Sequence, residues 1–282
     1  MEEKELKIIC EDLLKKPVEE IKTIPGGDIN LTFQIETDSE FYFCKTNSSE
    51  IGIDLLEKEA HGLSVLSRHC NVPEIVATAP KVLLLSWITD AKKSKVFWQK
   101  LGQSLANLHK ITSNKFGFDR DGYIGTLYQP NDLHDDWNSF YVAQRLEPQL
   151  RMAVDKGLLN TSDFGSVEFM EKIVNIVSPS ESATLIHGDL WSGNILCNEN
   201  GDPYFVDPCV SYAHREMDIA MSMLFAKFDP AFYDAYHEAR PLEKGYRDRM
   251  DIYQLYYLLA HLNMFGIGYK NDVIKIINRY FK

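Results

Sequence analysis

The sequence predicts an α+β protein with two lobes, a β-rich N-terminal lobe over residues 1–88 and a mainly helical C-terminal lobe over residues 89–282. Strand-like stretches rich in aromatic and apolar residues occupy much of the first ninety residues. From Lys92 onward, apolar residues recur mainly at helical spacing. A chain of 282 residues exceeds a typical single domain, which also favours a two-part organisation.

The N-terminal lobe is predicted to contain two helices around a small sheet. Apolar residues at helical spacing predict one helix over Glu2–Lys16 and a second over Leu55–Arg68. Strands are predicted at Ile29–Thr37, at the aromatic-rich stretch Phe41–Lys45 and at the short apolar run Val82–Ile88. The last of these is apolar throughout, so we expect it to be a buried strand.

The C-terminal lobe is predicted to be helical except for one segment. Apolar faces predict helices at Phe97–Leu108, Trp137–Ala153 and Met250–Phe265. Thr184–Cys209 interrupts this pattern and is predicted to form a strand, a polar loop and two further strands joined by a turn. Asn200-Gly201 is typical of a hairpin turn, because both residues tolerate a positive φ.

Composition excludes several classes of function. The formal net charge of −11 repels phosphate backbones, so we expect no nucleic-acid partner. No apolar run is long enough to cross a membrane, and the acidic start lacks the features of a signal peptide, so we expect a cytoplasmic protein. The five cysteines are scattered without a CxxC pair, which argues against a zinc site or a disulfide framework. The oligomeric state is left open.

The strongest chemical signal is the loop His187–Asn194, which is followed by Asp207. Phosphoryl transfer needs a base that orients the acceptor hydroxyl and metal ions that neutralise phosphate charge. Asp189 is the predicted base, and the side-chain oxygens of Asn194 and Asp207 are suitable ligands for Mg²⁺. A single aspartate or asparagine in a loop would more often form hydrogen bonds with the backbone of that loop. The ordered set therefore predicts phosphoryl transfer.

A second group of residues is predicted to bind the nucleotide. Kinases use a lysine on a strand to reach the α- and β-phosphates, and a glutamate on a helix holds this lysine. Lys45 and Glu59 fit those two positions. Each residue by itself would more often lie on the surface. Gly26 and Gly27 precede the lysine strand and are expected to bring a loop backbone close to phosphate, although a glycine pair also makes ordinary turns.

The adenine ring is expected to meet two parts of the N-terminal lobe. Ser86, Trp87 and Ile88 end the buried strand and are predicted to offer backbone groups to adenine. Period-two alternation places Phe43 on the same strand face as Lys45, where its ring would pack against adenine.

Several motifs together carry a family resemblance. The general ones are His187-x-Asp189-x4-Asn194 and Asp207, and the narrower ones are Trp191 and the run Tyr212–Met221. With these motifs the chain resembles the fructosamine kinase (ketosamine kinase) family of the protein-kinase-like fold, related to the aminoglycoside and choline kinases. The matches run from about residue 26 to residue 269; further ones are Trp98–His109, Tyr123–Gly125 and Tyr253–Tyr256.

The resemblance implies transfer of phosphate from ATP, with Mg²⁺, to the 3-hydroxyl of a ketosamine, the adduct of a sugar with a small-molecule or protein-bound amine. The product of that reaction is unstable, so the family implies removal of early glycation. We expect Trp191, His214 and Glu216 to contact this substrate, because they flank Asp189 and Asp207 in sequence. The glycine loop Pro25–Asp28 contains no cysteine, so a thiol switch in that loop is not supported.

Two alternatives stay open at this point. An aminoglycoside- or choline-type kinase would share Asp189, Asn194 and Asp207 but would not be expected to share Trp191 and the run His214–Glu216. A non-catalytic pseudokinase that acts as a binding module would be expected to lack part of the set that this chain keeps.

Overall fold

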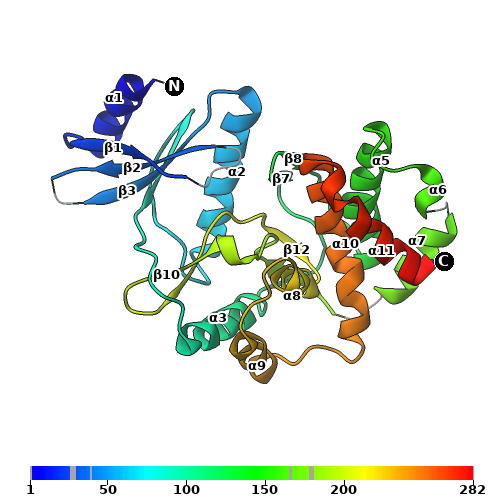
Figure 1. Ribbon diagram of the computed structural model, residues 1–282. Coiled ribbons are helices and arrows are strands. Elements are labelled where there is room, and N and C mark those ends of the chain that lie inside the picture. Colours follow the sequence, from blue (N-terminus) through cyan, green and yellow to red (C-terminus); the bar gives the residue numbers. More distant parts are fainter. Residues whose placement is uncertain (1, 26–29, 39, 165–166, 178–180, 282) are drawn as a thin grey trace. The chain divides into compact units, whose positions relative to one another are not determined.

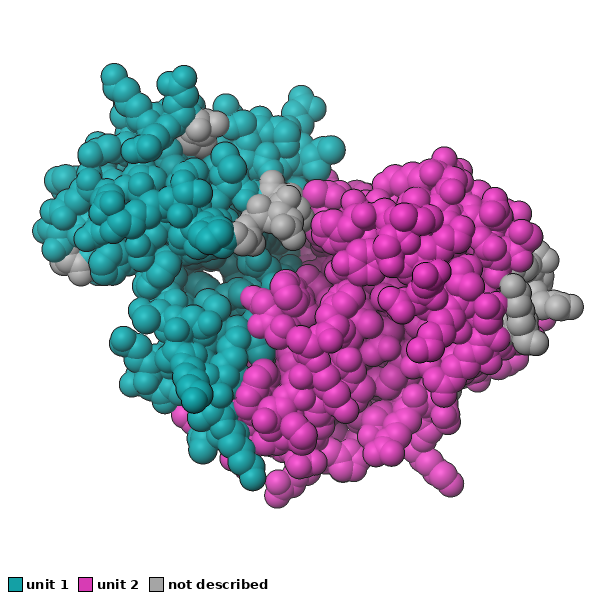
Figure 2. All heavy atoms as spheres, viewed as in Figure 1, with its two compact units in different colours: residues 1–97, 194–208 teal, residues 98–193, 209–282 magenta. Residues whose placement is uncertain are grey.

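The computed structural model describes residues 2–25, 30–38, 40–164, 167–177 and 181–281. The chain divides into two compact units, which Figure 2 shows in different colours. Unit 1 consists of Met1–Phe97 and Asn194–Pro208, and unit 2 of Trp98–Gly193 and Cys209–Lys282. The predicted lobe boundary after residue 88 stays a prediction.

Unit 1 is built on a five-stranded antiparallel sheet in the order β1-β2-β3-β5-β4 (Figure 1). Its sheet and the helices that pack on it are α1 (Glu3–Leu14), β1 (Glu20–Thr23), β2 (Leu31–Glu36), β3 (Phe41–Thr46), α2 (Glu50–Leu66), β4 (Ile75–Ala79) and β5 (Val82–Ser86).

Strand β5 explains why the two helices cover opposite faces of this sheet. Successive side chains of a strand point to opposite faces. Leu84 accordingly packs in a cluster with Cys10 of α1, whereas Leu83 packs with Leu56 of α2. Both faces of β5 are therefore buried, which is why its sequence is an unbroken apolar run.

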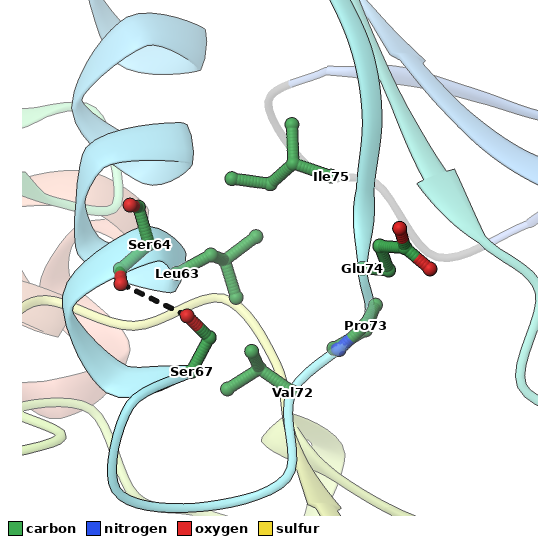
Figure 3. A pocket seen from close by; sticks show the side chains of 7 residues that line it. All are labelled: Leu63, Ser64, Ser67, Val72, Pro73, Glu74 and Ile75. Atoms are coloured by element: carbon green, nitrogen blue, oxygen red, sulfur yellow. Dashed lines mark hydrogen bonds between the residues drawn. The ribbon is translucent and has the colours of Figure 1, made fainter.

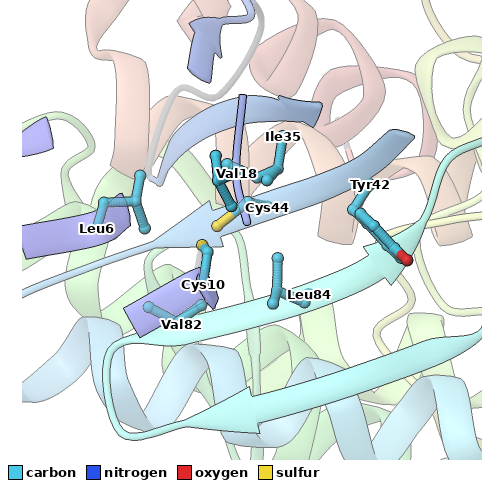
Figure 4. Close-up of a cluster of buried hydrophobic side chains, with 8 residues drawn as sticks. All are labelled: Leu6, Cys10, Val18, Ile35, Tyr42, Cys44, Val82 and Leu84. Carbon is cyan, nitrogen blue, oxygen red and sulfur yellow. The ribbon is translucent and has the colours of Figure 1, made fainter. Parts of the chain in front are cut away.

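The cluster on the α1 side is a core of buried, mostly apolar side chains (Figure 4). It contains Leu6, Cys10, Val18, Ile35, Tyr42, Cys44, Val82 and Leu84. The sulfur atoms of Cys10 and Cys44 face each other within it, and both cysteines are reduced. Helix α1 is thus fastened to β3, the strand that carries Lys45.

Helix α2 starts at a side-chain cap and ends beside a shallow pocket. The Ser49 hydroxyl accepts a hydrogen bond from Gly52 N at 3.0 Å, which satisfies one of the first amide groups of the helix. A pocket of about 320 Å³ lies where Leu63 and Ser67 face Val72 and Ile75 (Figure 3). No candidate site residue lines it.

A short hairpin from later in the chain completes unit 1. Strands β10 (Ile195–Cys197) and β11 (Pro203–Phe205) pair antiparallel around the predicted turn. Asn71, in the segment after α2, makes two hydrogen bonds with β11. Its backbone carbonyl accepts one from Phe205 N at 2.9 Å, and its side-chain amide donates one to the backbone carbonyl of residue 203.

Unit 2 is mainly helical, with two small sheets. A three-stranded antiparallel sheet has the order β12-β9-β6, and β7 pairs with β8. Its elements are α3 (Lys95–Leu108), β6 (Thr112–Ser113), β7 (Gly122–Ile124), β8 (Leu127–Gln129), α4 (Trp137–Tyr141), a π-helical turn (Val142–Leu146), α5 (Glu147–Asp155), α6 (Thr161–Phe164), α7 (Val167–Ile176), β9 (Ala183–Ile186), a 3₁₀ turn (Ser192–Asn194), β12 (Ser211–Ala213), α8 (Glu216–Met223), α9 (Pro230–Ala239), α10 (Tyr246–Phe265), a 3₁₀ turn (Ile267–Tyr269) and α11 (Lys270–Phe281).

Helix α10 forms the centre of unit 2. It packs against α8, α5 and α11, and α11 runs beside it in Figure 1. The stretch from Leu255 to Ala260 is buried on every side, so this part of the helix belongs entirely to the core. None of the helices in the described ranges combines the length and the apolar content that crossing a membrane requires.

Candidate active site

Three charged residues of unit 1 meet around the end of β3. Lys45 Nζ lies 2.8 Å from Glu59 Oε1 and 2.5 Å from Asp207 Oδ1. The lysine is only 5% exposed, whereas the Asp207 side chain is 48% exposed. β3 supplies Lys45, α2 supplies Glu59, and the residue after the β10–β11 hairpin supplies Asp207. Residues from three separate sequence regions therefore form one ion cluster.

The two carboxylates set the charge state of this cluster. Burial by itself would lower the pKa of Lys45, but the negative charges of Asp207 and Glu59 outweigh it, and the net pKa is raised. Burial, together with the nearby charge of Asp207, raises the pKa of Glu59 to about 7 although Lys45 opposes this. Lys45 is consequently a fixed cation, while Glu59 titrates near neutral pH.

Asn194 and Asp207 lie at the open end of the β10–β11 hairpin. Ile195 pairs with Phe205 in the ladder, and one position further Val206 N donates to Asn194 O at 3.0 Å. Asp207 follows at once, with a φ of +53°. Aspartate tolerates this left-handed conformation better than most residues. The hairpin thus brings the two predicted metal ligands to the same end of one element.

The donor chemistry of these residues fits Mg²⁺. Asn194 and Asp207 both offer side-chain oxygens, and the Asp207 carboxylate keeps substantial exposure beside its contact with Lys45. In the described part of the chain, His, Cys, Asp and Glu side chains do not gather in threes to form a metal cage. Mg²⁺ in phosphoryl-transfer sites is typically held by one or two protein ligands together with phosphate oxygens and water, so a closed cage is not required.

Asp189 of unit 2 follows strand β9 in a loop that is tightly fixed at Gly188. Gly188 has a φ of +86°, and a Cβ atom there would lie 1.9 Å from the Cys209 carbonyl oxygen. Cys209 N donates to His187 O at 2.8 Å. No residue other than glycine fits this position without moving the backbone. The close packing therefore fixes the backbone immediately before Asp189.

A buried aspartate on α8 holds the same loop. The Asp218 carboxylate accepts hydrogen bonds from His187 N and Gly188 N, both at 2.8 Å, and its Oδ2 lies 3.1 Å from His109 Nε2. Tyr257 of α10 donates its hydroxyl to Gly188 O at 3.0 Å. Neither Asp218 nor Tyr257 was predicted to be a site residue. Asp218 belongs to the run Tyr212–Met221 that carries the family resemblance, but the contacts of both residues with the loop depend on the tertiary fold.

Trp191 is half-exposed beside this loop. Its side chain is 40% exposed, and its ring lies so close to Gly193 that a Cβ there would stand 2.3 Å from the ring. The absence of a side chain at Gly193 thus leaves the space that the indole occupies. This exposure is compatible with the predicted contact between Trp191 and a substrate.

The expectation that His214 and Glu216 contact the substrate is not supported by their environment. Both side chains are fully buried. Glu216 pairs with Arg249 at 2.6 Å and 2.7 Å, and the His214 ring stacks on Tyr253 at 5.8 Å. A buried carboxylate that loses its cation is strongly destabilised, so Glu216 is not free to bind a ligand. The predicted substrate contact of His214 and Glu216 therefore stays a prediction, and the buried contacts of both side chains near the start of α8 do not favour it.

The remaining predicted nucleotide contacts lie at the end of β5 or outside the described residues. Ser86 N and Oγ bond the backbone of Glu74, so this residue joins β5 to the start of β4. Trp87 lies 6.5 Å from the Phe43 ring and, like Ile88, is half-buried. Gly26 and Gly27 fall outside the described residues.

Comparison with known proteins identifies the family. The family model for fructosamine kinase matches residues 1–282. A probable ketoamine kinase of Enterococcus faecium is 42% identical over 267 residues, which cover 92% of this chain and 95% of the relative. A chloroplastic protein-ribulosamine 3-kinase of Arabidopsis thaliana is 36% identical over 282 residues, covering 94% of this chain and 83% of the relative.

Solved structures agree with this match. A crystal structure from Haemophilus somnus, provisionally named a fructosamine-3-kinase, has a TM-score of 0.89 at 27% identity, with 98% of this chain and 97% of that chain covered. An ADP-bound aminoglycoside phosphotransferase shares the fold alone, with a TM-score of 0.66 at 14% identity over 98% and 97% of the two chains.

The fold and the ion cluster define a kinase of the protein-kinase-like fold, which confirms the predicted fold class. Within that class, the chain belongs to the fructosamine kinase family.

Proposed function

We propose that this chain transfers the γ-phosphoryl group of ATP to the 3-hydroxyl of a ketosamine. The observation that carries the proposal is the Lys45–Glu59–Asp207 ion cluster in a chain whose relatives are named ketoamine kinase and protein-ribulosamine 3-kinase. A ketosamine joins a sugar to a small-molecule or protein-bound amine, so phosphorylation would serve the removal of early glycation. We place this activity in the cytoplasm.

The nucleotide is assigned to unit 1. Lys45 binds the α- and β-phosphates, and Glu59 positions Lys45 for this contact. The backbone of Gly26 and Gly27 approaches the phosphates, while adenine meets the backbone of Ser86–Ile88. Residues 1–88 are accordingly proposed as the nucleotide-binding lobe, and residues 89–282 as the catalytic and substrate lobe.

Asn194 and Asp207 would hold Mg²⁺ through their side-chain oxygens. When bound, the ion neutralises charge on the phosphates. Asp207 is partly exposed, and its contact with Lys45 keeps that carboxylate beside the residue that binds phosphate.

Asp189 is the proposed general base that accepts the proton of the acceptor hydroxyl. The hydrogen bonds of His187 N and Gly188 N to Asp218 keep the loop in place, so the carboxylate does not have to be ordered at the moment of reaction. The exposed ring of Trp191 offers a flat surface to the sugar or amine of the acceptor.

Neither alternative from the sequence is favoured. An aminoglycoside- or choline-type activity would rest on a likeness of 14% identity, against 42% for the ketoamine kinase relative. A non-catalytic binding module would not need Asp189, Asn194 and Asp207 together with the Lys45–Glu59 pair.

Replacing the proposed base tests this assignment. Asp189→Asn is expected to lower turnover of a ketosamine by about 10²-fold or more, because the general base is lost. Binding of an ATP analogue and the thermal unfolding midpoint should stay near the wild-type values. The measurement is ATP-dependent gain of one phosphate by the ketosamine, with its position assigned by NMR. Near-normal turnover in the folded variant, or a phosphate at another hydroxyl, would contradict the proposal.

A further inference from the structure

A small hairpin in unit 2 presents two tyrosines on one face. Strands β7 and β8 place Tyr123 opposite Tyr128, and Ile124 opposite Leu127. Because side chains alternate along a strand, these two pairs point to opposite faces. Ile124 and Leu127 are buried, whereas Tyr128 is 53% exposed. The tyrosine face of the β7–β8 hairpin is therefore the one that meets solvent.

Strand β7 is fastened to the segment that packs on the Asp189 loop. Cys209 Sγ donates to Tyr123 O at 2.8 Å. The carbonyl oxygen of the same cysteine occupies the space where a Gly188 side chain would otherwise lie, and its amide donates to His187 O. Cys209 thus touches the hairpin and the residues immediately before Asp189.

Strand β8 is fastened to the same place by an independent route. Tyr256 of α10 donates its hydroxyl to Gln129 Oε1 at 2.5 Å, and the next residue, Tyr257, donates to Gly188 O. Strand β7 is therefore held by Cys209, which also packs on Gly188. Strand β8 is held by Tyr256, which directly precedes the tyrosine bonded to Gly188 O. An aromatic pair with one exposed and one half-buried ring, on a hairpin held at both strands, is typical of a binding surface, since rigid support keeps the rings in position.

A carboxylate lies beside the tyrosine pair. The two rings meet edge to face, with centroids 6.0 Å apart. The Tyr128 hydroxyl donates to Asp121 Oδ2, and Asp121 Oδ1 accepts Asn131 N at 2.8 Å. Asn131 is held in turn by the buried Arg145 at 2.7 Å. Electron-rich ring faces beside a carboxylate attract organic cations.

The geometry points to a subsite for the protonated amine of the acceptor at the Tyr123–Tyr128 pair. This inference rests on the proposed function, in which the acceptor is a ketosamine. In a ketosamine only C1, C2 and C3 separate the amine nitrogen from the 3-hydroxyl oxygen. The group that recognises the amine must consequently lie close to the loop that carries the base. The hairpin is linked to that loop indirectly, through Cys209 on one strand and through the adjacent residues Tyr256 and Tyr257 of α10 on the other.

The test compares two acceptors in the full chain. One is a fructose-derived secondary amine, which is protonated at neutral pH, and the other is its N-acylated analogue, which has the same sugar and an uncharged nitrogen. We expect wild type to prefer the amine in kcat/KM. Tyr128→Ala should raise KM for the amine about fivefold, the upper range of a cation–π contact at an exposed site, and leave KM for ATP unchanged. The preference for amine over amide should then largely disappear.

Two further variants separate ring recognition from loss of structure. Tyr128→Phe keeps the ring and loses only the bond to Asp121, so its KM for the amine should rise less than about threefold. Tyr280→Ala removes a tyrosine on α11 that lies 3.4 Å from the carboxylate of Asp251, and it should leave both acceptors unaffected. Thermal unfolding midpoints identify any variant that fails to fold.

The outcomes distinguish this inference from the proposed function. If Tyr128→Ala keeps the wild-type preference for the amine, or loses both acceptors equally, the amine subsite is refuted while ketosamine phosphorylation stands. If wild type phosphorylates neither acceptor, the proposed function is refuted and the subsite with it. Loss of the preference in Tyr128→Ala alone supports the subsite.

Discussion

The buried lysine at the end of β3 is surrounded by more negative charge than it can balance. Lys45 carries one positive charge, and Glu59 and Asp207 each offer a carboxylate within 2.8 Å. Burial is the main cause that raises the pKa of Glu59 to about 7. The charge of Asp207 adds to this effect, and Lys45 opposes it. Glu59 is therefore largely neutral below this pH and ionised above it, and only the ionised form holds Lys45 firmly.

This titration predicts a pH dependence of nucleotide use. Between pH 6 and pH 8, ionisation of Glu59 should strengthen its hold on Lys45 and lower the apparent KM for ATP by about fivefold, roughly 1 kcal/mol. The measurement is KM for ATP at saturating Mg²⁺ and acceptor across this range. Glu59→Gln removes the titrating group, so its KM should be higher at pH 8 and nearly flat with pH. A wild-type profile that matches Glu59→Gln would contradict the assignment.

Single residues differ in how far the sequence could reveal their roles. The Lys45–Glu59 contact was predictable, because the strand, the following helix and the spacing all appear in the sequence. The burial of His214 and Glu216 was not, since a run of polar residues gives no sign that Arg249, 33 residues after Glu216, is its partner. For the same reason the contact of Asp218 with the loop before Asp189 could not be predicted.

The loop before Asp189 depends on one glycine, and this predicts a large effect of a small substitution. Gly188→Ala places a methyl group 1.9 Å from the Cys209 carbonyl in a backbone with φ of +86°. The backbone must shift, so we expect a loss of at least about 3 kcal/mol of stability and strongly reduced turnover. Denaturant unfolding and ketosamine phosphorylation measure the two effects.

Gly157→Ala is the matched control for this substitution. Gly157 also has a positive φ, +67°, but an added Cβ would meet no atom within 4 Å. Its loss of stability should be limited to the conformational cost of about 1 kcal/mol, with turnover unchanged. Equal, small effects of the two substitutions would show that the packing at Cys209 is not what fixes the loop.

Several elements with a clear periodic pattern were predicted, whereas the 12-residue helix α11 and several short strands were missed. The expected helix at Glu2–Lys16 corresponds to α1, and the apolar run from Val82 corresponds to β5, because their periodic patterns span several residues. β1 was missed because its residues are largely exposed and lack an alternating apolar pattern. The strands of the β7–β8 hairpin have three residues each, too few for any period to appear.

The stability of the whole molecule is expected to depend on a buried neutral histidine. Burial lowers the pKa of His214 to about 3, although Glu181 opposes this effect. In the unfolded chain a histidine has a pKa of about 6.5. Between pH 6.5 and pH 3 the unfolded chain therefore binds a proton that the folded chain does not. This contribution to stability is complete above pH 6.5 and is lost as the pH falls toward 3.

Unfolding measurements at several pH values test this expectation. Lowering the pH from 6.5 to 4.5 should remove up to about 2–3 kcal/mol of stability through His214 alone. His214→Gln, which keeps a polar side chain of moderate size without the titration, should lose correspondingly less over the same range. Identical pH dependence in the two proteins would mean that His214 does not titrate as its burial implies.

The division of the chain into units could not be predicted in full. The change from strands to helices along the sequence indicated two parts, but nothing in residues 194–208 shows that they pack with the first part. That placement depends on contacts such as Phe205 N to Asn71 O, between residues 134 positions apart. It is also what brings Asp207 to Lys45.

The central claim is that the whole molecule is a ketosamine kinase, and one measurement tests it most directly. Acceptor-dependent release of ADP should be compared for a fructose- or ribose-derived amine adduct, an aminoglycoside and choline, each with ATP and Mg²⁺. We predict that the amine adduct is used at least about tenfold better in kcat/KM than either other class, as expected for a site that matches several polar groups of one substrate. Preference for choline or for the aminoglycoside would contradict the ketosamine assignment.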